Sequence, residues 1–498
     1  MPALKKYYLL FCICQLGIFF CVKAQVNPIA GSADGNLTAM IDSVAAAANE
    51  DSSKPVRPHF RIGEIVITGN KKTKSYYIER ELPFKKGDSM QLPQIVEKFK
   101  SAREWLMNTR LFNDVVVSLK SFRGYDVDIA IDVKERWYIF PIPYFKPIDR
   151  NVSAWASKGY SLDRINYGLK FTYYNFTGRN DKLRLWVVTG YTRQIQLQYE
   201  QPYADRSLKH GFGAGFVYSA FKEVNTGTSN NEQRFINSDT IPYAGRFLNE
   251  TWSLFATYNY RPALRTKHAV RLALNFNRVD SAVLVENPKF FNNGKETILY
   301  PELSYAGNYM NVDYAPYPLR GFMADFGFVR KGINKNMNLW EFSGSASYSK
   351  PLGSKFYYNV AGNGTVKLPF NQPFYNLRLL GYRDFYLRGL EKYVIDGVVG
   401  GLVKNTLRKE VFNTNVPIPF FKTRSHDHLP LRIYVKTYTD WGYVHNPVFK
   451  SNSLTNQFLY TGGFGIDVVT LYDLVLRFEY SFNQLGEKGF FFHVKNDF

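Results

Sequence analysis

Cysteine is scarce in this chain, and its three cysteines, Cys12, Cys14 and Cys21, all lie near the N-terminus. They fall inside an apolar run, residues 7–22, that follows two lysines and ends at the small-residue cleavage site Val22-Lys23-Ala24. This order is typical of a secretory signal peptide. A transmembrane anchor is the alternative, but a spanning helix needs about 20 apolar residues. We therefore predict a signal peptide over residues 1–24 and a mature chain without a thiol, a disulfide or a cysteine-based metal site.

Long apolar runs are missing after residue 24, so the sequence predicts no membrane-spanning helix. Aromatic residues are abundant instead, at 17% of the chain with 36 Tyr and 41 Phe. A membrane β-barrel carries aromatic girdles at both interfaces, while its polar lumen keeps the overall hydropathy low. The mean hydropathy of −0.28 is therefore compatible with a membrane barrel.

Acidic residues are outnumbered, with 42 Asp and Glu against 63 Lys and Arg. The formal charge of +21 falls to +18 in the mature chain, because the signal peptide removes three lysines and no acid. Such a charge suggests nucleic acid or anionic lipid as a partner. In a secreted chain we expect no nucleic-acid partner, and we interpret the charge as lumen and loop residues facing water and the phosphate-rich surface lipids of the membrane.

Signatures of catalysis are also missing, since the sequence contains no G-x-S-x-G, H-E-x-x-H or P-loop pattern. The segment Ser425-His426-Asp427-His428 could suggest a metal or a catalytic base. It stands in a predicted turn with no second cluster, so we interpret it as solvated polar residues. We therefore predict that the protein is not an enzyme, and we expect no cofactor and no metal.

Residues 25–59 are rich in Ala, Ser, Asn, Asp and Pro without a sustained strand pattern, so we interpret them as a flexible leader. From residue 60 to 136 the pattern reads strand, helix, helix, strand, strand. The second helix has apolar residues at i, i+4, i+7 and i+11, which are Ile95, Phe99, Ala102 and Leu106. This segment is long enough for one small core.

Four motifs in this segment carry a resemblance to a known family. They are Ile65-x-Ile67-x-Gly69-Asn70-x-x-Thr73, Ile78-x-Arg80-Glu81-Leu82, Leu111-Phe112-Asn113-Asp114-Val115-x-Val117 and Val133-Lys134-Glu135. In order and spacing they resemble a POTRA domain, with a generic small α+β domain as the alternative. The resemblance implies a periplasmic docking module over residues 60–136, with Gly69, Asn70 and Phe112 in the family motif. Its edge strand would accept the strand of a client or partner.

Residues 137–498 are dominated by alternation of apolar and polar residues, as in Val270, Leu272, Leu274 and Phe276. Alternation of this kind gives a strand one face for lipid and one for water. We predict a transmembrane antiparallel β-barrel of sixteen strands, at 137–146, 165–174, 182–191, 194–201, 211–221, 250–261, 268–279, 297–310, 320–331, 338–350, 355–368, 400–412, 431–441, 458–469, 471–482 and 489–498. Alternate connections are long, as expected of outer loops, apart from a long inner turn over 413–430.

The segment Phe385-Tyr386-Leu387-Arg388-Gly389-Leu390, in the sixth outer loop over residues 369–399, resembles the V/I-R-G-F/Y motif of the BamA/TamA outer-membrane insertase superfamily. Leu387 and Leu390 depart from the commonest residues of that motif. Asp440-Trp441-Gly442 resembles the family's Asp-x-Gly. The resemblance implies that the loop folds into the lumen and that Arg388 and Gly389 meet Asp440 and Gly442. We call Arg388 and Asp440 the loop-lock pair; an ordinary surface Arg-Gly turn is the alternative.

The C-terminus ends on an aromatic residue, Phe498, as bacterial outer-membrane barrels usually do. The preceding residues fit the polar-Gly-x-x-apolar-x-apolar pattern by which barrel substrates are recognised, with Lys488, Gly489, Phe492 and Val494 in the four places. We therefore predict a C-terminal assembly signal formed by Gly489, Phe492, Val494 and Phe498.

Together, the motifs resemble a single-POTRA member of this superfamily, of the bacterial surface antigen type. The resemblance implies an outer-membrane protein with its POTRA domain in the periplasm, which assists insertion, assembly or translocation of other proteins by binding them. Expected partners are unfolded outer-membrane client proteins and outer-membrane lipids. Periplasmic proteins or lipoproteins are further candidate partners. A two-partner-type secretion pore is one alternative. A passive porin or surface receptor is the other, and it leaves the POTRA motifs unexplained.

Overall fold

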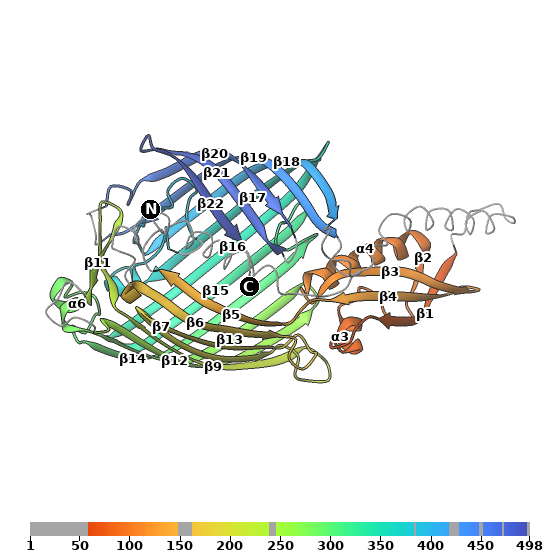
Figure 1. Ribbon diagram of the computed structural model, residues 1–498, viewed down its shortest axis with the longest axis horizontal. Coiled ribbons are helices and arrows are strands. Elements are labelled where there is room, and N and C mark those ends of the chain that lie inside the picture. The colour runs from red at the N-terminus through yellow and green to blue at the C-terminus, as the bar shows by residue number, and fades with distance from the viewer. Residues whose placement is uncertain are drawn as a thin grey trace, which may run out of the picture.

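The computed structural model describes residues 58–147, 162–238, 246–382, 385–417, 428–447, 452–470 and 473–495. Within these ranges the strands form sheets of four, two and sixteen strands (Figure 1). The predicted signal peptide, almost all of the predicted leader, most of the Ser425 to His428 segment and Phe498 lie outside the described residues. None of the described helices is long and apolar enough to cross a membrane.

The N-terminal unit is an α+β fold with the predicted order of its main elements. Its elements are β1 (His59–Thr68), α3 (Ser75–Arg80), β2 (Ser89–Gln91), α4 (Leu92–Asn108), β3 (Phe112–Arg123) and β4 (Asp126–Glu135). The sheet order is β2-β1-β4-β3, with β1 parallel to β4. The three-residue strand β2 was not predicted.

Helix α4 begins with a reciprocal capping box, in which the Gln91 amide donates to Gln94 at 3.0 Å. The helix buries the four apolar residues that its spacing predicted, and they pack with Ile129 and Ile131 of β4. This single apolar stripe covers one face of the sheet, so the unit has its own core.

The residues of the POTRA motif have clear local roles in this unit. Gly69 directly follows β1 and has a φ of 83°, and a Cβ there would lie 2.0 Å from the Val133 carbonyl oxygen. Only glycine fits both conditions. The side-chain Nδ2 of Asn70 donates to the Thr73 carbonyl and to Ser75 Oγ, each at 3.0 Å, which orders the start of α3. Phe112 is fully buried in the core.

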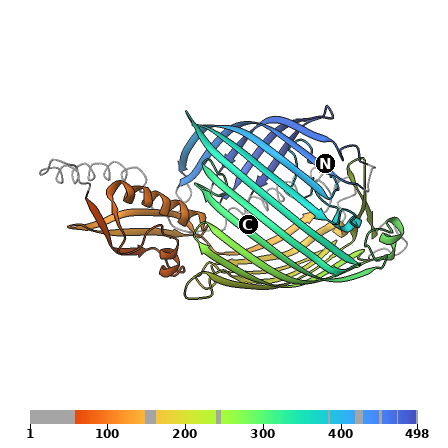
Figure 2. The same ribbon diagram turned by 180° about the vertical axis from the view of Figure 1, so that it is seen from behind.

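The sixteen-stranded sheet begins after the N-terminal unit and curls into a barrel (Figures 1 and 2). Its strands are β5 (Ile139–Pro147), β6 (Ile165–Tyr174), β7 (Lys182–Gly190), β8 (Thr192–Gln201), β9 (His210–Phe221), β12 (Asn249–Ala263), β13 (Thr266–Val279), β14 (Thr297–Val312), β15 (Gly321–Asn334), β16 (Met337–Gly353), β17 (Phe356–Leu368), β18 (Val399–Pro417), β19 (His428–His445), β20 (Phe458–Val469), β21 (Val475–Asn483) and β22 (Lys488–Lys495). Each corresponds to one predicted strand, so the predicted fold class and strand number are confirmed.

The faces of the strands follow the predicted alternation. Leu272 and Leu274 of β13 are 61% and 50% exposed on the outside of the barrel. Asn277, on the other face of the same strand, is 3% exposed. An apolar exterior around a polar interior is the pattern of a sheet whose outer face meets hydrocarbon.

The predicted inner turn over 413–430 is wrong in its extent. The ladder between β18 and β19 continues to Pro417 and His428, beyond the pairing of β18 with β17 at Lys409 and of β19 with β20 at Arg432. The paired extension includes Pro417 and Pro430. They are tolerated because each strand in this projecting part of the hairpin pairs on one side only. The backbone N–H that proline lacks is therefore not needed on the unpaired side.

The third outer connection contains a hairpin that the sequence analysis missed, made of β10 (Glu223–Ser229) and β11 (Glu232–Asn237). Its turn residues Asn230 and Asn231 have φ values of 53° and 61°. Two adjacent asparagines between alternating residues are a signal for a type I′ hairpin, and this signal could have revealed the element. The fourth outer connection similarly contains a short helix, α6 (Ser281–Glu286).

Consecutive strands of the barrel pair throughout, but the sheet order begins at β22 and ends at β5. Among the described residues no ladder joins these two end strands. In Figure 1 both lie toward the viewer, with β22 above β5. We call the boundary between them the seam.

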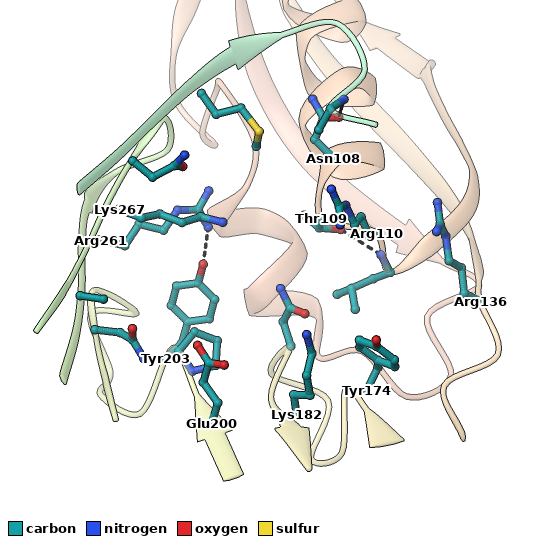
Figure 3. Close-up of a pocket in the computed structure, with 18 of the residues that line it drawn as sticks. Asn108, Thr109, Arg110, Arg136, Tyr174, Lys182, Glu200, Tyr203, Arg261 and Lys267 are labelled. Atoms are coloured by element: carbon teal, nitrogen blue, oxygen red, sulfur yellow. Dashed lines mark hydrogen bonds between the residues drawn. The ribbon is translucent and has the colours of Figure 1, made fainter. Parts of the chain in front are cut away.

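The N-terminal unit is fixed to the inner end of the barrel, which is the end next to it in Figure 1, by buried ion pairs. Arg261 of β12 contacts both carboxylate oxygens of Glu81: Nη1 pairs with Oε1, and Nη2 donates to Oε2 at 2.8 Å. Nη1 of Arg261 also donates to the Tyr203 hydroxyl. Arg136 contacts Asp473 at 2.7 Å. Between them lies a cavity of about 490 Å³, with Arg261 and Lys267 on one wall and Arg136 on the opposite wall (Figure 3).

We predict that the N-terminal unit folds on its own, because its two helices and four strands share one core. Residues 58–138, which include the buried Tyr138, should give a circular dichroism spectrum of mixed helix and strand. They should also give a cooperative thermal transition. Phe99→Ala should lower the stability of this fragment by about 3 to 5 kcal/mol. A disordered spectrum for the parent fragment would contradict the domain boundary.

The stability of this fragment should also depend on the ionisation of Asp128. Hydrogen bonds from Arg123, the Glu64 amide and Ser121 hold the pKa of Asp128 well below its usual range. Because the unfolded pKa is about 3.9, these bonds stabilise the fold above about pH 4, and their contribution is lost as the pH falls further.

Asp128→Asn should therefore lower the free energy of unfolding at neutral pH and flatten its decrease between about pH 4 and pH 2. Urea unfolding of the fragment over a pH series measures both effects. Asp126→Asn, a partly exposed position on the same strand, is the control. Identical pH profiles for wild type and Asp128→Asn would show that this carboxylate does not contribute.

Candidate functional site

The candidate site is the loop over residues 369–398 and the lumen surface that it contacts. The loop carries a set of buried apolar residues that pack against strands β18, β19 and β20, which are Leu379, Leu380, Leu387, Leu390, Tyr393 and Ile395. Leu387 and Leu390, the two departures from the family motif, are both fully buried in this cluster. A loop with its own apolar core can hold its neighbouring polar side chains in fixed positions.

The structure brings Arg388 and Asp440 together as a two-pronged ion pair. The Nε and Nη2 atoms of Arg388 donate to Oδ2 and Oδ1 of Asp440 at 2.8 and 2.5 Å. The backbone amide of Arg388 also donates to Oδ2, at 3.1 Å. The two side chains are 9% and 0% exposed, so this contact is not an exposed surface turn.

The remaining donors of the Arg388 guanidinium are also used. Nη1 donates to Thr406 Oγ1 at 3.1 Å, and Nη2 donates to the Asn405 carbonyl at 3.3 Å. The guanidinium carbon lies 3.9 Å from the centre of the Tyr438 ring. The side chain therefore connects the loop to two adjacent strands, β18 and β19, through charge, hydrogen bonds and a cation–π contact.

Two glycines allow the loop to approach the barrel wall. Gly389 has a φ of 92°, and a Cβ there would lie 2.9 Å from Cβ of Ser481. Its carbonyl accepts a hydrogen bond from Asn483 at 2.8 Å. A Cβ at Gly442 would lie 3.0 Å from Leu387 Cδ1. Both glycines of the predicted site therefore leave space for close packing of the loop on β19 and β21.

A second charged cluster lies beside the loop-lock pair. Nζ of Lys436 lies 2.5 Å from Oδ1 of Asp467 and 2.6 Å from Oε1 of Glu479. Oε1 of Glu479 is also 4.0 Å from Nη1 of Arg388. The sequence analysis did not select these residues. The sequence places these ionisable residues on the polar faces of predicted strands, which predicts that they face the lumen. It does not predict which of these side chains contact one another.

The residues of the predicted C-terminal assembly signal divide between two faces of β22. Phe492 and Val494 are 52% and 50% exposed on the outer face, where the Phe492 ring lies 5.0 Å from that of Phe478. A Cβ at Gly489 would lie 3.2 Å from the Phe491 ring. Phe498 lies outside the described residues, so the assembly signal remains a prediction.

Comparison with known proteins supports the N-terminal assignment. The POTRA family model, described as the surface antigen variable number repeat, matches residues 60–136. This match confirms the resemblance predicted for that segment. No curated protein matches the chain.

Solved structures that this chain resembles at low identity include the following three. BamA from Haemophilus ducreyi, lacking POTRA domains 1–3, is 16% identical, with coverage of 89% of this chain and 86% of that chain and a TM-score of 0.46. CdiB from Escherichia coli is 9% identical, with coverage of 94% and 98% and a TM-score of 0.45. CdiB from Acinetobacter baumannii is 12% identical, with coverage of 95% and 89% and a TM-score of 0.47.

We predict that Arg388 and Asp440 are energetically coupled. Arg388→Ala and Asp440→Ala should each cost about 3 to 5 kcal/mol, because each leaves the other charge buried without its partner. The double variant should be no worse than the worse single variant. Unfolding of the detergent-solubilised protein, followed by the heat-modifiable band on gels, measures the three costs.

The matched control is the partly exposed pair Arg320 and Glu104, whose atoms are 2.9 Å apart. Alanine at either position should cost at most about 1 kcal/mol. Additive losses in the Arg388 and Asp440 cycle would contradict the coupling.

Proposed function

We propose that this protein lies in the bacterial outer membrane with its POTRA region in the periplasm, and that it assists insertion, assembly or translocation of other proteins there. The mechanism is binding, without bond chemistry. Its partners are unfolded client proteins and outer-membrane lipids, with periplasmic or lipoprotein partners as further candidates. The proposal is supported by the apolar outer face of the barrel and the family match over residues 60–136.

The observation that carries the proposal is the seam. Backbone donors and acceptors inside a membrane need partners, and an unpaired strand edge leaves a row of them unsatisfied. In this chain β5 and β22 have a described ladder on one side only, formed with β6 and β21 respectively. A strand of a client protein would satisfy that edge by adding to the sheet.

The outer end of the barrel favours insertion over secretion through the lumen. The β10–β11 hairpin contacts two other outer loops: the Asn231 carbonyl accepts from Val394 at 2.8 Å, and the Asn231 side chain donates to Ser453 at 2.8 Å. Asp396 of the loop over 369–398 accepts hydrogen bonds from Thr228 of the hairpin and from Tyr382. We call the β10–β11 hairpin and the outer loops that it contacts the cap. Secretion through the lumen requires the cap to move, whereas insertion at the seam leaves it in place.

We predict that depletion of the protein lowers the abundance of other barrel proteins in the outer membrane, as measured by proteomics of the membrane fraction. Wild type should restore them and Arg388→Ala should not, because the loop loses its contact with β19. Arg320→Ala is the control variant and should restore them.

A locked cap separates the alternatives. The chain has no cysteine after residue 21, so cysteines introduced at Asn231 and Ser453 can be joined selectively by a short bismaleimide. Cells with the joined cap should still assemble barrel proteins. Accumulation of a secreted protein in the periplasm of these cells would instead identify a secretion pore. A porin or receptor would be indicated if depletion of the protein changed the abundance of neither barrel proteins nor secreted proteins.

A further inference from the structure

Three potential metal ligands converge where the loop over 369–398 meets the last two strands. They are Glu391 from the loop, Glu479 from β21 and His493 from β22, and their ligand atoms all lie within 4.8 Å of one another. Nε2 of His493 is 3.4 Å from Oε1 of Glu391 and 3.5 Å from Oε2 of Glu479. The three residues do not form a sequence motif with the spacing of known metal sites, so the sequence did not predict this cluster.

Each carboxylate is held by one oxygen and turned toward the cluster with the other. Oε2 of Glu391 accepts a hydrogen bond from the Gly389 amide at 2.7 Å, and Oε1 of Glu479 contacts Lys436 Nζ at 2.6 Å. The ring of His493 stacks on Tyr386, with centroids 5.5 Å apart. Contacts of this kind orient metal ligands in proteins.

The atoms that point into the cluster are not satisfied by hydrogen bonds. Oε1 of Glu391 and Nε2 of His493 are buried and make no hydrogen bond among the described residues. A buried polar atom without a partner is costly, and such an atom in a native fold calls for an explanation. A bound ion would satisfy both atoms at once.

The distances fit a metal ion better than a direct hydrogen bond. Zinc binds nitrogen and oxygen at about 2.0 to 2.1 Å, so two ligand atoms of a tetrahedral site lie about 3.3 to 3.4 Å apart. The two measured separations, 3.4 and 3.5 Å, agree with this spacing. A good hydrogen bond between a nitrogen and an oxygen would be about 2.7 to 3.2 Å long.

The two carboxylates of the cluster differ in their basic neighbours, because Lys436, Arg388 and Arg477 all act on Glu479. Among the described residues Arg388 pairs closely with Asp440, and Lys436 is shared by Asp467 and Glu479. No lysine or arginine of the described residues pairs with Glu391. The side chains of Glu391 and His493 are 14% and 26% exposed, so water can occupy a fourth ligand position.

We propose that Glu391, Glu479 and His493 bind a divalent transition-metal ion, for which one imidazole and two carboxylates favour Zn²⁺. This departs from the sequence-based expectation of no metal. The ion connects the loop that carries Arg388 to β21 and to the end strand β22. Metal occupancy is therefore coupled to the position of β22 at the seam.

Zinc binding tests the site directly. Full-length protein without a histidine tag, purified in detergent and freed of metal by a chelator, should bind one Zn²⁺ per chain in equilibrium dialysis with elemental analysis. Glu391→Gln and His493→Gln should each weaken binding by about tenfold or more. His210→Gln should bind as wild type does, because His210 contacts Tyr258 and lies outside the cluster. Glu479 is not varied, since Lys436 depends on it.

Two further measurements keep the test independent of how the variants fold. Zinc should raise the unfolding temperature of wild type, because a ligand that binds only the folded state stabilises it, and Co²⁺ should give wild type the visible absorption of a four-coordinate site. Absence of binding by wild type, or binding by both variants as tight as that of wild type, would overturn the proposal. Glu391 and His493 would then be adjacent polar side chains without a bound ion. Metal binding is measured without client proteins, so its failure is distinct from failure of the proposed function.

Discussion

The need to satisfy backbone hydrogen bonds where water is excluded is the constraint on which the rest of this structure depends. In hydrocarbon each strand must pair on both sides, and a sheet can do this only by curving round until its ends meet. Fifteen adjacent strand pairs of this chain meet the requirement, and their continuity makes the apolar exterior possible. The requirement remains open at β5 and β22 alone among the described barrel strands, so the seam is where the sheet has a reason to accept another strand.

The same exclusion of water governs the lumen, where charges must be neutralised by one another. Arg388 is satisfied by Asp440, and Lys436 is satisfied by Asp467 and Glu479. The first contact joins the loop to β19, and the others join β19 to β20 and β21. Removal of Arg388 or Asp440 leaves a buried charge. The position of the loop is therefore set by ion pairs on one side and by its leucine-rich core on the other.

The sequence revealed those parts of the structure that depend on local pattern. Alternation located all sixteen barrel strands, and helical spacing located the buried face of α4. The Asp440 partner of Arg388 came from the family motif rather than from a pattern in this chain. Side chains that meet through the closure of the barrel gave no such signal: Glu391, Glu479 and His493 come together only because β21 and β22 bring the C-terminal strands beside the loop. The extension of β18 and β19 beyond the neighbouring strands was missed because it projects past the pairing with β17 and β20, which only the strand register reveals.

Three successive features of one short segment connect the loop to the seam. Arg388 anchors the loop on β19, the space beside Gly389 lets it approach β21, and the Gly389 amide holds the Glu391 carboxylate. That carboxylate faces His493 on β22, so the end strand and the loop-lock pair are joined through four consecutive residues of the loop. A displacement of β22 by an added strand would therefore change the surroundings of both carboxylates that face His493, which are Glu391 on the loop and Glu479 on β21. Glu479 also lies 4.0 Å from Arg388, so the loop-lock pair is close to β22 through β21 as well as along the loop.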